Sequence, residues 1–254
     1  MPRLPGMISP LQLDFLNGGA ARAVEVSEVG ELPSALVSLE LHPPRRTVVV
    51  VGGAGGLDDA GMERLCPVIG SGIVPVLERL GAVGVDGGTL SGVMRMLGEA
   101  RSAQGAFFPL VGVVAAGTVA LPGRPAPSFA DAVLEPHHTH FVIVPGDHWG
   151  AESPWIARTA TVLAGTAPSI TVLINGGEIA YSDAERSVQA GRRVVVIAGS
   201  GRTADVIAQA LAGTGADARS QALSESGLVH SVPVDDPAAL AELLAEFLGE
   251  ASAD

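Results

Sequence analysis

Short, continuous runs of hydrophobic residues recur along the chain and alternate with segments of helical periodicity. Seven of these runs are four to eight residues long and rich in β-branched residues, which is typical of strands buried on both faces of a parallel sheet. They span residues 47–51, 82–85, 108–115, 139–144, 170–174, 193–197 and 228–234. A further short strand is expected over 23–26, whereas residues 1–20 show no clear period and are expected to form a loose arm.

Apolar residues at helical spacing fill most of the segments between these strands. The predicted helices span residues 31–41, 72–80, 90–101, 153–164, 179–190, 202–211 and 237–248. Strands and helices alternate throughout, and no linker-like segment divides the chain. We therefore predict one domain over residues 1–254, with a Rossmann-like α/β fold: a mostly parallel sheet of about seven strands with helices on both faces.

Composition narrows the classes of partner. The chain has 254 residues and a formal net charge of -12, which argues against nonspecific binding to nucleic acid or to an anionic membrane, because both need clustered Lys or Arg. No hydrophobic run approaches the about 20 residues of a membrane span, and the N-terminus has no signal-peptide pattern. A bacterial, cytoplasmic protein is expected. The single cysteine, Cys66, excludes an intrachain disulfide and is expected to be a small core residue.

Five of the predicted strands end in turns built from small residues. Carboxyl ends of parallel strands meet at one edge of a sheet, where ligands of open α/β sheets bind. Glycine at such turns allows positive φ and a close approach of ligand to backbone. A nucleotide-sized, phosphate-bearing ligand is the prediction, and plain turn geometry is the alternative. The turns are Gly52-Gly53, Asp86-Gly87-Gly88, Pro145-Gly146, Asn175-Gly176-Gly177 and Gly199-Ser200-Gly201.

The last of these turns leads directly into a predicted helix that begins with Arg202 and Thr203. Free backbone N–H groups and the positive end of the helix dipole favour an anion at such a position. Arg202 could add a charge-assisted hydrogen bond and Thr203 a hydroxyl. Phosphate binding is therefore predicted here, with a capped structural turn as the alternative.

Two common nucleotide-binding patterns are absent from the sequence. The phosphate-binding pattern GxxxxGK[ST] does not occur, and the run from Gly52 to Gly56 lacks the order GxGxxG. Neither a P-loop enzyme nor an ordinary dehydrogenase fits the chain.

Three stretches carry a family resemblance. DGGTLSGVM, residues 86–94, resembles the first signature of the SLOG superfamily, also called LSDAT, which joins LOG phosphoribohydrolases, Smf/DprA and the N-terminal region of TRPM channels. NGGE, residues 175–178, stands where these proteins have a second glycine motif. AGSGRTAD, residues 198–205, resembles a segment of the TRPM region. Between about Thr47 and Ala210, the chain is most similar to the stand-alone prokaryotic branch of TRPM-like SLOG domains.

The resemblance implies a Rossmann-like domain that binds or senses nucleotide-derived ligands of the ADP-ribose or NAD-related class, with no obligatory cofactor. The implied pocket uses the first motif for one phosphate or ribose, the second motif as its other wall, and the third as a phosphate cradle. These residues are Gly87, Gly88, Thr89, Ser91 and Gly92, then Gly176, Gly177 and Glu178, then Gly199, Ser200, Gly201, Arg202 and Thr203.

The chain departs from the hydrolase branch at the second motif. LOG enzymes carry Pro-Gly-Gly-x-Gly-Thr-x-x-Glu, and Asp183 stands here where their glutamate would be. Glu178 and Asp183 are the catalytic candidates, although Glu178 could equally hold a ribose hydroxyl or stabilise a helix N-terminus. A nucleotide N-glycosidase or phosphoribohydrolase is thus one alternative. An oligomeric interaction module with a vestigial pocket is the other, and a homo-oligomer is compatible with the sequence.

Two further clusters offer chemistry. Trp155, after the Pro145-Gly146 turn, could stack on a base or pack in the core, and Arg158 on the same helix could reach a phosphate. His137, His138 and His140, with Asp147 and His148 beyond the strand, have side chains that ligate zinc. The first three precede a strand, at the end opposite the glycine turns, so no metal site is expected.

Overall fold

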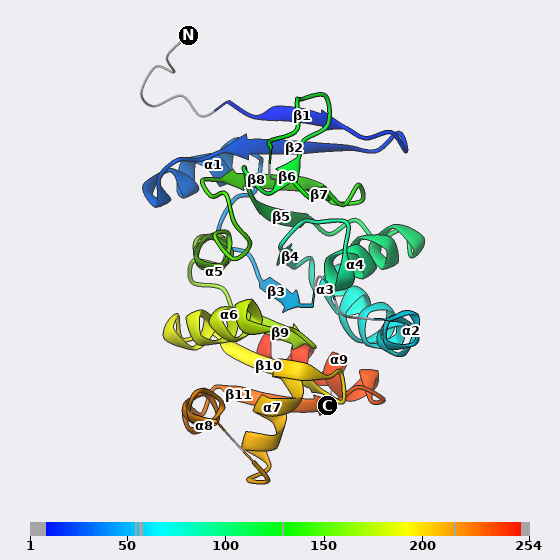
Figure 1. The fold of residues 1–254 in the computed structure, drawn as a ribbon, viewed down its shortest axis with the longest axis vertical. Coiled ribbons are helices and arrows are strands. Elements are labelled where there is room, and N and C mark those ends of the chain that lie inside the picture. The colour runs from blue at the N-terminus through cyan, green and yellow to red at the C-terminus, as the bar shows by residue number, and fades with distance from the viewer. Residues whose placement is uncertain (1–8, 54, 56–57, 129, 216, 250–254) are drawn as a thin grey trace.

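A computed structural model describes residues 9–53, 55, 58–128, 130–215 and 217–249. Within this part of the chain, nine strands form one sheet in the order β1-β2-β8-β5-β4-β3-β9-β10-β11, parallel except for the pair β1–β2 (Figure 1). The prediction of a Rossmann-like, mostly parallel sheet is confirmed, with nine strands instead of about seven. They are β1 (Leu11–Asp14), β2 (Ala20–Glu25), β3 (Thr47–Gly52), β4 (Val83–Asp86), β5 (Leu110–Ala115), β8 (His140–Val144), β9 (Ser169–Ile174), β10 (Arg193–Ala198) and β11 (Val229–Pro233).

Helices cover both faces of the sheet, on its two sides in Figure 1. Two short strands, β6 (Val119–Ala120) and β7 (Ala132–Val133), pair with each other apart from the main sheet. The helical segments are η1 (Val29–Glu31), α1 (Leu32–Ser38), α2 (Asp59–Pro67), η2 (Val68–Ile73), α3 (Val74–Leu80), α4 (Gly92–Ala103), α5 (Ser153–Ala164), α6 (Glu178–Gln189), α7 (Arg202–Leu211), α8 (Ala218–Glu225) and α9 (Pro237–Phe247).

The central strand β3 shows how the sheet is buried. Its alternate side chains Val49 and Val51 belong to a cluster with residues of α1, α5, α6 and α7, whereas Val48 and Val50 pack with residues of α2, α3, α4 and α9. All four are at most 4% exposed. A valine fully removed from water contributes roughly 1.5–3 kcal/mol, so a strand with two apolar faces is stable only between two helical layers.

The structure corrects the prediction that the N-terminal residues form a loose arm. Residues 9–20, part of the predicted loose arm, contain β1 and the start of β2, and Phe15 N donates to Gly19 O at 2.8 Å to close the hairpin between them. Leu13 is 2% exposed and packs with Phe141 of β8. An alternation of four residues is too short to identify a strand, so tertiary packing decided this segment. Residues 1–8 and 250–254 of the predicted domain lie outside the described residues, as do Ala54 and Gly56 of the first glycine loop.

One helical run is longer and more apolar than predicted. α2, η2 and α3 follow one another over Asp59–Leu80, and by length and hydropathy this run could cross a membrane. Its residues Leu65, Ile69, Ile73 and Leu77 are at most 1% exposed within the core. The run therefore packs against the core of the domain, and the charged residues Glu63, Arg64, Glu78 and Arg79 keep its uninterrupted apolar stretch shorter than a membrane span. Cys66, on the same run, is exposed, so the prediction of a core cysteine is wrong.

The path of the chain defines one special point on the sheet. From β3 the chain adds β4, β5 and β8 on one side, then returns to place β9, β10 and β11 on the other side. β3 and β9 are hydrogen-bonded neighbours whose following helices α2 and α6 lie on opposite faces. Outside the carboxyl ends of two such strands, α/β sheets leave a crevice. A ligand site is therefore expected at this edge of the sheet.

Candidate functional site

A cavity of about 710 Å³ opens at the carboxyl edge of the sheet, beside the ends of β3, β4 and β9. Ligand pockets commonly have about 300–1,000 Å³. Nine residues predicted from the sequence line this cavity, and they come from four separate turns. They are Gly52, Gly53, Gly87, Thr89, Ser91, Gly177, Glu178, Asp183 and Arg202.

The β4–α4 turn forms one wall of the cavity. Gly88 has φ +62°, and a Cβ on it would lie 2.8 Å from Gly112 Cα and 3.0 Å from the Phe141 ring. Only glycine allows this turn to pass so close to β5 and β8. The Thr89 and Ser91 hydroxyls lie 3.3 Å apart, and both residues line the cavity. The turn thus presents two hydroxyls and a glycine to any ligand.

A buried network of charged side chains supports this turn from behind. Asp86 Oδ1 accepts a hydrogen bond from Gly88 N at 2.7 Å and lies 2.8 Å from His138 Nε2. The other ring nitrogen, Nδ1, lies 2.7 Å from Glu135 Oε2, and Glu135 N donates to Gly88 O. Asp86, Glu135 and His138 are each at most 2% exposed. The Gly87–Ser91 turn is therefore fixed to the segment before β8 by a carboxylate–imidazole–carboxylate arrangement.

The protonation of this network follows from its geometry. Burial alone would lower the pKa of His138, but the two carboxylates in contact with its ring raise that pKa to about 9. Burial acts to raise the pKa of Glu135, and the hydrogen bonds from His138 and His137 outweigh it and lower that pKa. At neutral pH His138 is a buried cation that donates from both ring nitrogens.

The other histidines are dispersed. His137 Nδ1 lies 2.5 Å from Glu135 Oε1, His140 Nδ1 lies 2.7 Å from the Thr139 hydroxyl, and His148 pairs with Asp147 on an exposed loop. Burial, with the nearby charge of Arg22, lowers the pKa of His140 to about 4. Among the described residues, no group of three or more His, Cys, Asp or Glu side chains has an arrangement that could hold a metal ion. The sequence predicts these histidines at the end of the sheet opposite the glycine turns. The His138 side chain nevertheless contacts Asp86, at the start of the β4–α4 turn.

The turns after β9 and β10 are joined to each other by hydrogen bonds. Asn175 N donates to Ser200 Oγ at 2.8 Å, and Asn175 Nδ2 donates to Ser200 O at 2.7 Å. Asn175 has φ +58°, a left-handed conformation that asparagine tolerates better than most residues. Ser200 Oγ in turn donates to Ile197 O at 2.6 Å. These side chains are used within the protein, as a clasp between the two turns.

The N-terminus of α7 is closed by the same clasp. Ala204 N donates to Asn175 O at 3.0 Å, Thr203 N donates to Gly176 O at 3.4 Å, and the Thr203 hydroxyl donates to Gly177 O at 3.0 Å. Two backbone N–H groups and one hydroxyl at the helix start where a phosphate was predicted thus donate to carbonyl groups in this structure. The Arg202 guanidinium extends into the cavity wall, where Nη1 donates to Gly55 O at 3.3 Å. The β10–α7 turn therefore contributes the Arg202 side chain to the cavity lining.

The wall between α5 and α6 is acidic. Glu152 and Asp183 line the cavity and are 9% and 8% exposed. Burial, together with the charge of Glu152, raises the pKa of Asp183 to about 6, although the Ser153 hydroxyl donates to its carboxylate. Burial likewise raises the pKa of Glu152. Sequence reasoning found Asp183 through its place in the second motif and missed Glu152, which only the packing of α5 against α6 brings to the cavity.

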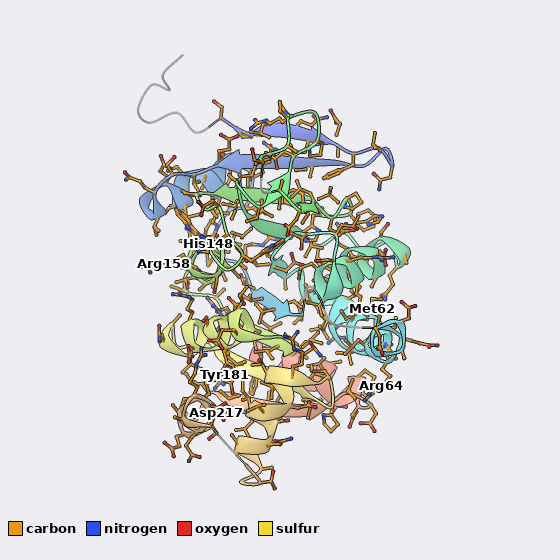
Figure 2. All side chains as sticks on the ribbon, viewed as in Figure 1. Met62, Arg64, His148, Arg158, Tyr181 and Asp217 are labelled. Carbon is orange, nitrogen blue, oxygen red and sulfur yellow. The ribbon has the colours of Figure 1, made fainter. Side chains whose placement is uncertain are left out.

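Glu178 lies at the rim of the cavity and has a partner already. Its carboxylate pairs with Arg219 of α8, whose guanidinium also donates to Glu185 at 2.7 and 2.9 Å and stacks on the Tyr181 ring. The Tyr181 hydroxyl donates to Asp217 at 2.8 Å, so α6 and α8 are linked at the position labelled in Figure 2. Glu178 in this structure serves an ion-pair network at the helix start.

Trp149 is the aromatic residue of the site that sequence reasoning missed. It is 39% exposed, lines the cavity, and donates from Nε1 to Asp131 Oδ2 at 3.2 Å. Leu90, Val133 and Ile179 are also exposed hydrophobic residues of this cavity. The sequence signal that could have identified it is the pair Trp149-Gly150 in the loop after Pro145-Gly146. The mouth of the cavity is therefore apolar and aromatic.

Trp155, the tryptophan named from the sequence, is partly buried and packs against the core cluster that includes residues of α1, α5 and α6. Arg158 of α5 is exposed and lies outside the cavity (Figure 2). Other predicted residues stand behind or beside the lining, and their contact with a ligand stays a prediction. They are Asp86, Gly88, Gly92, Gly146, Asn175, Gly176, Gly199, Ser200, Gly201 and Thr203, while Pro145 lines a separate hollow of about 410 Å³.

Comparison with known proteins agrees with this arrangement. Residues 45–242 match the sequence model of the family described as "SLOG in TRPM, prokaryote". Mouse transient receptor potential cation channel subfamily M member 2 is 29% identical over 205 residues, covering 66% of this chain and 13% of the channel. The rat protein of the same name is 29% identical over 208 residues, covering 68% of this chain and 14% of the channel.

The chain thus spans only a small part of the channels that it matches. Among solved structures, the X-ray structure of the structural-genomics target TM1055 covers 78% of this chain and 99% of its own, with 20% identity and a TM-score of 0.49. Since the family match extends over most of the sequence and includes all of the cavity-lining turns, the chain belongs to the prokaryotic family of TRPM-type SLOG domains.

Proposed function

We propose that the chain binds, as a sensor or binding module, a nucleotide-derived ligand of the ADP-ribose or NAD-related class in the cavity at the carboxyl edge of the sheet. The observation that carries this proposal is the combination of walls in one cavity: glycine turns with hydroxyls, one arginine, and an apolar aromatic mouth. A nucleotide has a phosphate, a ribose and a flat base, which match these three surfaces in turn. Membership of the SLOG family supports a nucleotide-related role. A cytoplasmic location is part of the proposal.

Arg202 is the cation that we assign to the phosphate. It is the arginine among the described residues that line the cavity, and Gly52, Gly53 and Gly55 line the cavity with it. A Cβ on Gly177 would lie 2.8 Å from Arg202 Nη2, so a small residue at 177 leaves room for the guanidinium. Charge-assisted hydrogen bonds to phosphate are about twice as strong as neutral ones.

The test is calorimetry with ADP-ribose, cyclic ADP-ribose, NAD and AMP, followed by chromatography of each mixture. Binding without turnover is expected. Arg202→Ala should weaken binding by about 2 kcal/mol, or roughly 30-fold, the scale of a hydrogen bond to a charged group. Arg158→Ala is the matched control, because Arg158 is an exposed arginine outside the cavity, and it should bind like the wild type. Equal affinity in Arg202→Ala and wild type contradicts the assignment.

Hydrolysis of a nucleotide N-glycosidic bond is the second candidate function. Asp183 favours it, because a buried carboxyl with a pKa of about 6 on a cavity wall suits a general acid or base near neutral pH. Chromatography separates the two candidate functions, because a hydrolase releases free base or ribose phosphate and a binding module leaves the nucleotide intact. If no member of the panel binds, both functions are excluded and an interaction module with a vestigial pocket is what remains.

A further inference from the structure

Four carboxylates line the cavity, and two of them have polar partners at its rim. Glu178 is paired with Arg219, and Asp131 accepts the hydrogen bond of the Trp149 indole. Glu152 and Asp183 differ, because both are buried and neither forms an ion pair with any residue that the structure describes. Glu152 accepts a hydrogen bond from the Gly150 N–H, and Asp183 accepts one from the Ser153 hydroxyl. Within the part of the chain that the structure describes, the cavity thus contains two carboxylates that are not paired with a cationic side chain.

Buried carboxylates are normally paired with a cation, because desolvation of an isolated charge is costly. Here that cost shows in the raised pKa of both groups, with Asp183 at about 6. The charge of Arg186 acts to lower the pKa of Asp183 and that of His148 acts to lower the pKa of Glu152, but burial outweighs both. A cation that entered the cavity would offset the desolvation of the pair, which is an arrangement more typical of a binding site than of a structural core.

The rest of the cavity limits what kind of cation fits. Ile156, Met94 and Trp149 line it together with the two carboxylates. Apolar and aromatic surfaces suit a flat, weakly hydrated ring better than a small, strongly hydrated ammonium group, and a positive ring also gains from the face of a tryptophan. The arginine wall, by contrast, carries positive charge at Arg202. The cavity lining thus carries an arginine as well as the two buried carboxylates.

We propose that Glu152 and Asp183 form a subsite for a cationic aromatic ring, so that the cavity selects nucleotides whose base carries a positive charge, the pyridinium class. This inference rests on the proposed function and deepens it by naming the chemistry of the base. The ligand then has an anionic phosphate at Arg202 and a cationic ring at the carboxylate pair. The selection depends on charge, since a neutral ring of the same shape contacts the same apolar surfaces.

Nicotinamide mononucleotide and its dihydro form are the matched probes. They share phosphate, ribose and ring size, and differ by the single positive charge of the oxidised ring. Calorimetry at pH 7.5 should show the oxidised form binding at least about tenfold tighter, the scale of one hydrogen-bonded or ion-paired charge. Glu152→Gln and Asp183→Asn should each reduce this ratio toward one. Glu185→Gln, on the same helix but paired with Arg219, should keep the wild-type ratio.

The outcomes separate this inference from the proposed function. A ratio near one in the wild type, or an unchanged ratio in both carboxylate variants, overturns the cationic subsite while AMP or ADP-ribose binding still supports the nucleotide site. Equal loss of AMP and oxidised-ring affinity in the variants assigns the pair to ribose hydroxyls and also overturns it. If no nucleotide binds the wild type, the proposed function and this inference fail together. Thermal melting of each variant confirms that it is folded at the temperature of measurement.

Discussion

Two glycine turns of this domain look alike in sequence and behave differently in the structure. The β4–α4 turn and the β10–α7 turn each connect a buried strand to a helix through two glycines. In the first, Thr89 and Ser91 face the cavity, and the partners that fix the turn lie behind it in the buried Asp86–His138–Glu135 network. In the second, the front is occupied, because backbone donors and hydroxyls of α7 bind the carbonyls of the β9–α6 turn.

The difference lies in where each turn finds its hydrogen-bond partners. Every buried N–H and C=O must be satisfied, and a turn satisfied from behind keeps its outer surface free for a ligand. A turn satisfied by its neighbour across the sheet edge becomes a structural joint, and then only a long side chain such as Arg202 extends to the cavity. A glycine turn before a helix therefore predicts a possible anion site only when its supporting contacts are known.

Breaking the buried network tests the first half of the comparison and should have the largest effect. His138→Ala leaves the carboxylates of Asp86 and Glu135 buried without their cation, so it should lower the free energy of unfolding by about 3–5 kcal/mol. Urea denaturation at pH 7 measures this change. His148→Ala is the control, because His148 is exposed and pairs only with Asp147, and a change within about 0.5 kcal/mol is expected. Similar stability of the two variants would show that the network is not needed.

The same network predicts a dependence of stability on pH. The folded-state pKa of His138, about 9, lies above its ordinary value of 6.5, so folding takes up a proton in the range between them. Its stabilising contribution is complete below pH 6.5 and is lost as the pH rises through 9, a change on the order of 3 kcal/mol. Denaturation at pH 7, 8 and 9.5 measures it. His138→Ala should remove this slope, and an equal slope in the variant would assign it to other groups.

A matched pair of serine substitutions compares the two turns directly, with smaller effects. Ser200→Ala removes one donor and one acceptor of the clasp and should cost about 1–2 kcal/mol of stability, because Asn175 N loses its partner. Ser91→Ala should change stability by less than about 0.5 kcal/mol, since among the described residues the contact of its hydroxyl is a long one, 3.3 Å to Thr89. It should instead lower AMP affinity several-fold in calorimetry. The opposite pattern would reverse the roles given to the turns.

Most of the fold could be predicted from the sequence because the strands β3, β4, β5, β8, β9 and β10 are mainly runs of apolar residues, which are typical of a parallel sheet. Short elements could not. β1 has four residues, and α8 shows no amphipathic pattern, being started by the Asp217–Ser220 capping box. α2 follows a glycine-rich stretch and carries three acidic residues, Asp59 and Glu63 with the cap Asp58, which obscured its helical period.

The site could be predicted as far as its motifs reveal it, which give the glycine turns, Thr89, Ser91, Glu178, Asp183 and Arg202. Trp149 and Glu152 lie on a loop and a helix start whose direction depends on how α5 packs, and His138 reaches Asp86 across 52 residues of sequence. Such long-range partners have no local signature. The motifs located the correct edge of the sheet, whereas the acidic wall and the network behind the β4–α4 turn required three-dimensional coordinates.

The clasp between the turns after β9 and β10 has a consequence for the thermodynamics of binding. Because Asn175, Ser200 and Thr203 already hold these turns together, Arg202 is attached to a frame that needs no ordering when a ligand arrives. Each rotamer-rich side chain or loop that must be immobilised usually subtracts about 0.5–1.5 kcal/mol from affinity. A preorganised frame avoids that loss, so association should require little structural rearrangement and should be limited mainly by diffusion and by the entry of the ligand into the cavity mouth.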